Sequence, residues 1–316
     1  MSILQIQSPP ICPKESDYSS ILNNLGSKKT GFLLDHLTLI SITGSDAEKF
    51  LQNQFSNDVS TVTGSETQLN AYCNPKGRIL AMLYLMKQAD GGYWIIVPND
   101  LTSELIKRLK IFVMRAKVSI EVEEEKAMFG MAVNGNDSFD LEIYQYIDKF
   151  HRSIAIGEPE QLNGVADQFD QLLSSDYWRL CDMFSGLPQI YSQTVEQCIP
   201  QHINLDLVSG ISFSKGCYPG QEIIARLRYL GKSKYRLCNA SVMSKERIEP
   251  GRALFEQAQV DQKAGLVIDA VETGEDQYQL SAMIKYSAGK HPDIHLDSEN
   301  GSELTLGVLP YEVPIE

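Results

Sequence analysis

The sequence predicts an α+β protein that ends in a separate all-β module. Before residue 230, segments with the hydrophobic periodicity of strands alternate with segments that have the periodicity of amphipathic helices. After Tyr235 no helix of useful length is expected, and turn sequences such as Glu249-Pro250-Gly251 separate four short apolar segments, at 237–242, 264–271, 278–284 and 304–309. We therefore expect an α+β region at 1–230 and a small barrel or sandwich at 231–316.

Local signals place the elements of the first region. Residues 31–43 alternate as a strand does, and Ser45 to Glu48 form a capping-box pattern that opens a short helix, about residues 46–55. Apolar runs and alternation predict further strands at 79–86, 93–97, 118–122 and 127–133.

Three more helices are expected in this region. Asn99 or Asp100 would cap the first, which ends near Ala116 and has one apolar stripe made of Leu101, Leu105, Leu109 and Phe112. Residues 141–150 are compatible with the second. The third begins at Ser175 or Asp176, and Gly186 closes it.

The most informative segment of the chain is the octapeptide Lys215-Gly216-Cys217-Tyr218-Pro219-Gly220-Gln221-Glu222. Pro219 and Gly220 suit the central positions of a type II turn, because proline presets the first φ and glycine accepts the positive second φ. Such a turn would present Cys217 at a fixed angle, and Lys215 would favour its thiolate. Two interpretations stay open: a reactive or ligand-contacting thiol, or a buried structural cysteine.

The chain as a whole is strongly acidic, but the segment around the octapeptide is basic. With 316 residues and a net charge of −13, the chain as a whole would repel a nucleic-acid backbone. Residues 211–236 carry one acid, Glu222, against six basic residues, which are Lys215, Arg226, Arg228, Lys232, Lys234 and Arg236. This cluster indicates either a site for a small anionic ligand or a solvated strand face.

Six cysteines and five histidines are dispersed without metal-ligand spacing, so no metal site is expected from this chain alone. The N-terminal residues lack a signal-peptide pattern, and scattered cysteines in a long chain are typical of reduced thiols. The longest apolar run, 79–86, is far shorter than the ~20 residues that a membrane span needs. A cytoplasmic location is therefore expected.

Together these segments resemble the YgfZ family, the folate-binding branch of the glycine-cleavage T-protein superfamily. The octapeptide matches the family signature Lys-Gly-Cys-Tyr-x-Gly-Gln-Glu in full. Supporting matches occur in the family's order, at residues 42–47 and 50–52, Lys76-Gly77-Arg78, residues 178–188, Pro200-Gln201, Asn204-Leu205 and Ala225-Arg226. The resemblance covers most of the chain.

The resemblance implies ferredoxin-like, T-protein-type α+β domains arranged as a ring with a C-terminal small β-barrel. The first 230 residues would hold two such subdomains, and a central channel would bind tetrahydrofolate or a derivative. It also implies a role in assembly or repair of iron–sulfur clusters, linked to tRNA modification through a cluster-dependent tRNA-thiolating enzyme. The implied partners are the folate and iron–sulfur enzymes or cluster-assembly proteins, with no direct nucleic acid and no membrane.

The resemblance also implies an aromatic wall for the folate site. Two tryptophans are associated with folate in the family's characterised member, and Trp178 matches one of them. The other position holds Leu37, a departure, because leucine can line a pterin pocket but cannot stack on an aromatic ring. From the residues alone, Trp178 has a second interpretation as a core side chain of an amphipathic helix.

The octapeptide region supplies the remaining candidates. Cys217 is the candidate functional thiol, with Lys215 beside it, and cofactor contacts are expected from Tyr218, Gln221, Glu222, Arg226 and Arg228. The two arginines would bind tail carboxylates in a bidentate manner or be ordinary surface residues. Glu222 would bind a pterin N–H pair or cap a helix that starts after Gly220, and Gln221 has the same two interpretations.

The expected function is that of a folate-binding accessory protein for iron–sulfur enzymes, without classical turnover. The alternative is a folate-dependent one-carbon transferase of the aminomethyl type, although the catalytic carboxylate of such an enzyme cannot be placed in this sequence. A protein that modifies RNA directly is the least favoured, because the net charge is −13.

Overall fold

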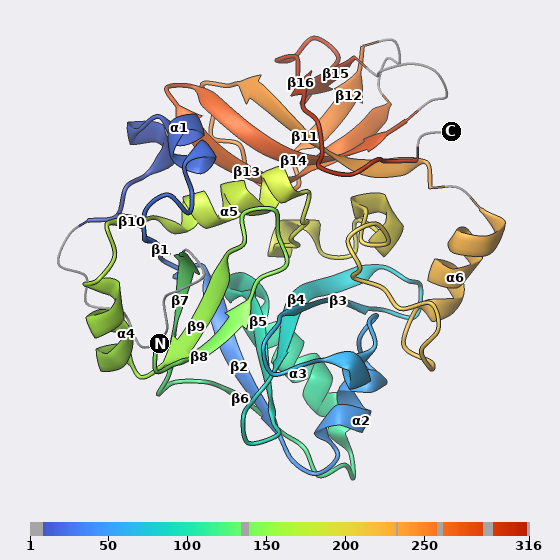
Figure 1. Ribbon diagram of the computed structural model, residues 1–316. Coiled ribbons are helices and arrows are strands. Elements are labelled where there is room, and N and C mark those ends of the chain that lie inside the picture. Colours follow the sequence, from blue (N-terminus) through green and yellow to red (C-terminus); the bar gives the residue numbers. More distant parts are fainter. Residues whose placement is uncertain (1–8, 134–138, 232, 258–261, 287–292, 315–316) are drawn as a thin grey trace. The chain divides into compact units, whose positions relative to one another are not determined.

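The computed structural model describes residues 9–133, 139–231, 233–257, 262–286 and 293–314 (Figure 1). The chain divides into two compact units, of which the first comprises residues 1–54, 58–70 and 83–181 and the second 55–57, 71–82 and 182–316. The described residues form six α-helices: α1 (Tyr18–Asn23), α2 (Ala47–Gln52), α3 (Thr102–Val113), α4 (Pro159–Ala166), α5 (Ser175–Ser185) and α6 (Gln221–Leu230). None of these helices has the length and apolar character that crossing a bilayer requires.

One five-stranded sheet has the order β3-β4-β5-β2-β6. Its strands are β2 (Leu37–Thr43), β3 (Gln68–Cys73), β4 (Ile79–Lys87), β5 (Tyr93–Pro98) and β6 (Ser119–Val122). The strands predicted at 79–86, 93–97 and 118–122 are confirmed, and the one predicted at 31–43 is present from Leu37. Every residue of β4 except Lys87 is buried, as its continuous apolar run requires. The chain passes from one unit to the other within β3 and within β4.

The helix predicted after β2 is present as α2, but the predicted capping box is wrong. The N-cap is Asp46, and no side chain caps the helix. The Asp46 carboxylate instead accepts the backbone N–H of Lys117 at 2.7 Å, and the Glu48 carboxylate accepts the Tyr93 hydroxyl at 2.8 Å. Partners distant in sequence have therefore replaced the local bonds that the Ser45–Glu48 pattern offered.

The next predicted helix is confirmed as α3, with a narrower apolar stripe. Leu105 and Leu109 are buried, whereas Phe112 is 51% exposed, so the stripe ends one turn early. A 3₁₀ turn over Asn99–Leu101 precedes α3, and neither predicted cap residue closes the helix with its side chain. The last predicted helix is confirmed as α5, and Gly186 follows it with a φ of +66°.

A second five-stranded sheet, with the order β10-β1-β7-β9-β8, lies in the first unit. Its strands are β1 (Thr30–Phe32), β7 (Ala127–Ala132), β8 (Glu142–Gln145), β9 (Ser153–Gly157) and β10 (Gln171–Leu173). Phe129 of β7 and Ala155 of β9 share a buried core with Leu162 of α4. The helix considered for residues 141–150 is wrong, because β8 pairs with β9 there and buries Tyr144.

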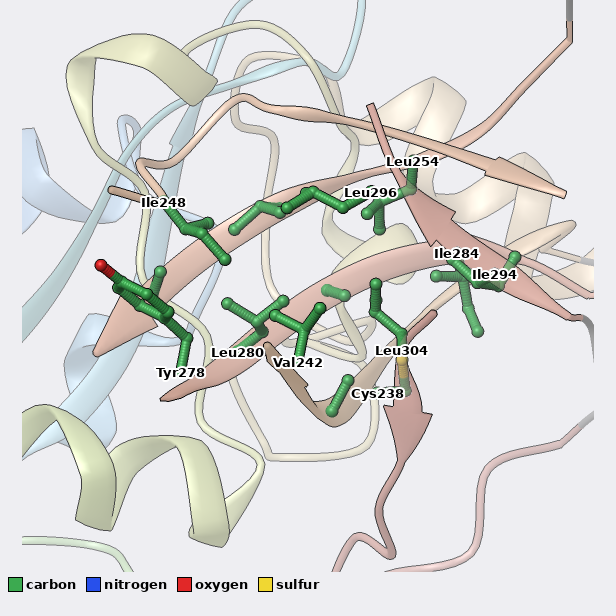
Figure 2. Packing of buried hydrophobic residues seen from close by; sticks show 14 of the residues in the cluster. Cys238, Val242, Ile248, Leu254, Tyr278, Leu280, Ile284, Ile294, Leu296 and Leu304 are labelled. Atoms are coloured by element: carbon green, nitrogen blue, oxygen red, sulfur yellow. The ribbon is translucent and has the colours of Figure 1, made fainter. Parts of the chain in front are cut away.

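The third sheet belongs to the second unit and forms the predicted all-β module. Its order is β15-β12-β13-β14-β11-β16. The strands are β11 (Tyr235–Met243), β12 (Ala253–Glu256), β13 (Lys263–Gly274), β14 (Gln277–Lys285), β15 (Ile294–Leu296) and β16 (Thr305–Leu306). Figure 2 shows its buried cluster, in which Leu254, Leu280 and Leu296 are at most 4% exposed. Each such side chain contributes roughly 1.5–3 kcal/mol to the free energy of unfolding.

Candidate functional site

The octapeptide lies in the second unit, and Pro219-Gly220 forms the predicted type II turn. Gly220 has a φ of +83° and a ψ of −2°, and the Gln221 amide donates to the Tyr218 carbonyl oxygen at 3.2 Å. These are the dihedral angles of the third residue and the closing bond of such a turn. Helix α6 begins at Gln221, so the turn joins Cys217 directly to a helix.

The turn packs closely against a second segment of the same unit, the loop around Gly77. A β-carbon at Gly220 would lie 2.6 Å from the Gly77 Cα and 2.7 Å from the Asn74 carbonyl oxygen. The Asn74 side-chain oxygen accepts the amides of Lys76 at 2.9 Å and Arg78 at 3.0 Å, which holds this loop in shape. Two motifs far apart in sequence are thus in contact through their glycines. Their backbones lie too close together there for a side chain at Gly220.

Replacing Gly220 by alanine is expected to destabilise the protein by more than about 1 kcal/mol, because an L-residue at this positive φ is strained and its β-carbon would meet backbone atoms. Urea unfolding measures the change. The matched control is Gly216→Ala in the same loop, since a β-carbon there meets no atom within 4 Å. Equal stability of the two variants would contradict the proposed contact.

Lys215 anchors the other end of the octapeptide. Its side chain is 8% exposed, and the ammonium donates to the carbonyl oxygens of Phe55 at 2.8 Å and Asn57 at 2.6 Å, within the same unit. The ammonium also lies 5.4 Å from the centre of the Tyr218 ring. Its described contacts therefore fix the loop, and an effect of Lys215 on the thiol stays a prediction.

Cys217 is exposed between these anchors, so its interpretation as a buried structural cysteine is wrong. All six cysteines lie in described residues, and Cys217 is the only exposed one. Burial raises the pKa of Cys198 to about 12 and raises the pKa of Cys73 further, so both stay protonated thiols. Across the described ranges, no three His, Cys, Asp or Glu side chains are grouped as metal ligands would be.

Native-state alkylation tests this difference in exposure. Under mildly alkaline conditions iodoacetamide is expected to modify Cys217 at least about tenfold faster than Cys73 or Cys198, because the reagent needs an accessible thiolate. Peptide mass spectrometry gives the rate at each cysteine, and the same reaction in denaturant should equalise the rates. Labelling of Cys73 before Cys217 would contradict the described burial.

The polar candidate residues that follow the turn lie on helix α6. The solvated strand face considered for this part of the basic cluster is therefore wrong. Gln221 is half-buried, and Glu222, Arg226 and Arg228 are exposed. Residues two apart on a helix point about 200° apart, so the two arginines face different directions. The Arg228 guanidinium lies 5.2 Å from the Phe213 ring centre. Carboxylate binding by either arginine stays a prediction.

The basic cluster is also smaller than its composition indicates. Arg236 is 7% exposed, and its guanidinium binds the Asp206 carboxylate at 2.8 Å and the Gln201 carbonyl oxygen at 3.0 Å. Lys215 is committed to backbone carbonyls, and Lys232 lies outside the described residues. Among the described residues of the cluster, the charge available to a ligand is therefore concentrated on Arg226, Arg228 and Lys234.

The aromatic candidates belong to the first unit and lie in its core. Trp178 is 1% exposed, and its ring meets Phe32 and Tyr146 edge to face at centroid distances of 5.4 and 4.8 Å. Leu37, the first residue of β2, is 6% exposed and pairs with Pro98. This geometry agrees with the interpretation of Trp178 as a core side chain, and ligand contacts of Trp178 and Leu37 stay predictions.

The residues that hold Trp178 were not found from the sequence. The Arg152 guanidinium lies 3.8 Å from the Trp178 ring centre, donates to its carbonyl oxygen at 2.8 Å and forms an ion pair with Asp148. Both charged side chains are 0% exposed. Burial, followed by the charges of Arg179 and Arg152, lowers the pKa of nearby His36 to about 3. The spacing of Asp148 and Arg152 was visible, but it is a common surface pattern.

Comparison with known proteins defines the class. No family model matches the chain. The crystal structure of the glycine cleavage system aminomethyltransferase T from Bartonella henselae superimposes with a TM-score of 0.71, over 93% of this chain and 89% of that one. At 13% sequence identity this likeness shows the fold alone, which this chain shares with that aminomethyltransferase.

Sequence relatives narrow the class to one family. The tRNA-modifying protein YgfZ of Buchnera aphidicola is 31% identical over 261 residues, which are 76% of this chain and 80% of the relative. That of Klebsiella pneumoniae is 29% identical over 306 residues, 89% and 92% of the two chains. An uncharacterised Haemophilus influenzae protein is 31% identical over 244 residues, 75% and 83%. The chain belongs to the YgfZ family.

Proposed function

We propose that this protein is a cytoplasmic, tetrahydrofolate-binding accessory protein that supports assembly or repair of iron–sulfur clusters in client enzymes, and tRNA modification through them. The observation that carries the proposal is the exposed Cys217 thiol, held between a buried lysine anchor and a glycine-locked turn. A fixed, accessible sulfur is suited to contact a one-carbon unit, a sulfur species or a cluster shared with a partner. Family membership supports the same role, since the relatives are named tRNA-modifying proteins.

The exposed groups near the thiol suit the polar ends of a reduced folate. The Glu222 carboxylate can accept an N–H pair of the pterin, and the Arg226 guanidinium can hold a tail carboxylate. Trp178 fits less well as a stacking platform, because its ring is buried and Arg152 covers one face. When bound, the folate would supply a one-carbon carrier, and the chain's own residues would orient it.

The rival function is a folate-dependent one-carbon transferase, which the likeness to an aminomethyltransferase favours. The two functions differ in turnover. Purified protein incubated with methylene-tetrahydrofolate and an amine acceptor should leave the folate unconsumed if the accessory role is correct. Catalytic consumption would favour the transferase. The ring arrangement of the domains, the division at residues 230 and 231, and the absence of direct nucleic-acid and membrane partners remain predictions.

Calorimetric titration with tetrahydrofolate tests the proposed cofactor. We expect saturable binding that Arg226→Ala weakens about tenfold, the loss typical of one charge-assisted ion pair. The matched control is Arg247→Ala in the same unit, whose side chain is 84% exposed. Absence of binding to the parent protein would overturn the folate assignment, and equal binding by the three proteins would remove Arg226 from the site.

A further inference from the structure

The first unit contains a large pocket that the proposed function does not use. Its volume is about 870 Å³, within the range of small-molecule sites. Helix α3 forms one wall, and β2 with the segments 33–35 and 122–128 forms the others. Figure 1 shows α3 beside the sheet that contains β2. The candidate residues Cys217 and Glu222 are not part of it.

The walls of this pocket are mainly apolar. Leu34 and Leu39 are each 4% exposed and Met128 is 9% exposed. Ile106 and Val122 also contribute apolar surface to the lining. Helix α3 has two apolar faces. Leu105 and Leu109 are buried in the core, whereas Ile106 lines the pocket. Because such an open apolar surface is costly in water, a hydrocarbon ligand body would be stabilised here.

Most polar groups of the lining are already bound within the protein. The Thr38 hydroxyl donates to the Asn99 side chain at 2.7 Å, and the Thr102 hydroxyl donates to a backbone carbonyl oxygen at 3.3 Å. The Glu123 carboxylate accepts two backbone amides, and Lys126 is paired with Glu142 at 3.5 Å. These groups therefore offer little to a polar ligand and would tolerate an apolar one.

Two lysines on α3 supply the remaining charge. Lys107 and Lys110 line the pocket, are exposed, and form no ion pair with any described residue. Three residues apart on a helix, they lie on the same face. The Asp35 carboxylate is the one opposing charge of the lining that no described group engages. The rim of the apolar pocket is therefore positively charged, although the chain has a net charge of −13.

We infer that this pocket binds an amphiphilic carboxylate, such as a fatty acid, with its hydrocarbon body against Leu39, Ile106 and Met128 and its carboxylate at Lys107 and Lys110. The apolar walls select a hydrocarbon body, and the unpaired ammonium groups select an anionic end. Neutral lipids lack the charge, and nucleotides lack the apolar body. The inference is independent of the folate assignment, because the two sets of residues do not overlap.

Displacement of a fluorescent fatty acid tests this inference. Dansyl-labelled undecanoate is expected to bind the full chain saturably, and decanoate should displace it at least about tenfold better than decanol of the same length. Lys107→Ala with Lys110→Ala should weaken decanoate about tenfold and remove its advantage over decanol. Ser103→Trp, at an exposed position on the pocket wall, should weaken both ligands by filling the space.

The matched control exchanges two exposed lysines of the same unit, Lys49→Ala with Lys117→Ala, and should bind like the parent. Thermal unfolding checks that every variant is folded. The inference is overturned if the probe does not bind saturably, if Ser103→Trp binds as the parent does, or if decanol and decanoate compete equally.

Discussion

Replacing Cys217 by serine is expected to abolish the function in cells while leaving the fold and folate binding intact. Serine keeps the size and the exposed position, but at neutral pH its hydroxyl lacks the nucleophilicity and the metal affinity of a thiolate. The stability should change by less than about 0.5 kcal/mol, as at other surface positions. The level of thiolated tRNA, in cells deleted for their own copy and complemented with the variant, should equal that of cells carrying an empty vector.

Cys12→Ser is the control for this experiment, because Cys12 is the one half-buried cysteine and lies outside the octapeptide. It should complement fully. Calorimetry with tetrahydrofolate on the purified Cys217→Ser protein separates a lost thiol from a lost binding site. Full complementation by Cys217→Ser would show that the sulfur is not the functional group. The proposed function would then lose the observation on which it rests.

Replacing Arg152 by methionine is expected to cost about 3–5 kcal/mol of unfolding free energy, because it leaves the Asp148 carboxylate buried without its counter-charge. The change also removes the cation above the Trp178 ring and the bond to its carbonyl oxygen. Urea unfolding, followed by far-ultraviolet circular dichroism, measures the difference.

The double variant Arg152→Met with Asp148→Leu separates the pair from the packing. It should be more stable than the single variant, since replacing both buried charges by apolar groups avoids the uncompensated carboxylate. Arg108→Met is the exposed control: Arg108 pairs with Glu104 at 2.8 Å, but both side chains are about half exposed, and the cost should be below about 1 kcal/mol. A cost for Arg152→Met as small as that for Arg108→Met would refute the described burial.

The sequence predicted the elements well where periodicity is local and uninterrupted. The apolar run that became β4 and the short apolar segments that became β13 and β14 were found from the sequence, because these strands are buried along most of their length. The helix considered for residues 141–150 is wrong, because β8 pairs with β9 there. Asp148 and Arg152 lie between these strands and form a buried ion pair, and Arg152 also lies over the Trp178 ring.

In the candidate site too, the features set by local sequence were predicted and those set by distant contacts were not. Proline and glycine specify their own dihedral angles, so the turn at Pro219-Gly220 was readable from two residues. Two other contacts of the site could not be predicted from local sequence patterns. Gly220 packs against Gly77, and the Lys215 ammonium donates to the Phe55 and Asn57 carbonyl oxygens. Both depend on backbone atoms, which every residue type carries alike.

By itself, the sequence determined the fold class, the type II turn beside Cys217 and membership of a family, because periodicity, turn chemistry and motif order are properties of the chain as written. Only the tertiary structure decided which cysteine is exposed, which charges are buried and that α3 lines an apolar pocket. Exposure and electrostatic pairing are set by neighbours distant in sequence, and no local pattern records them.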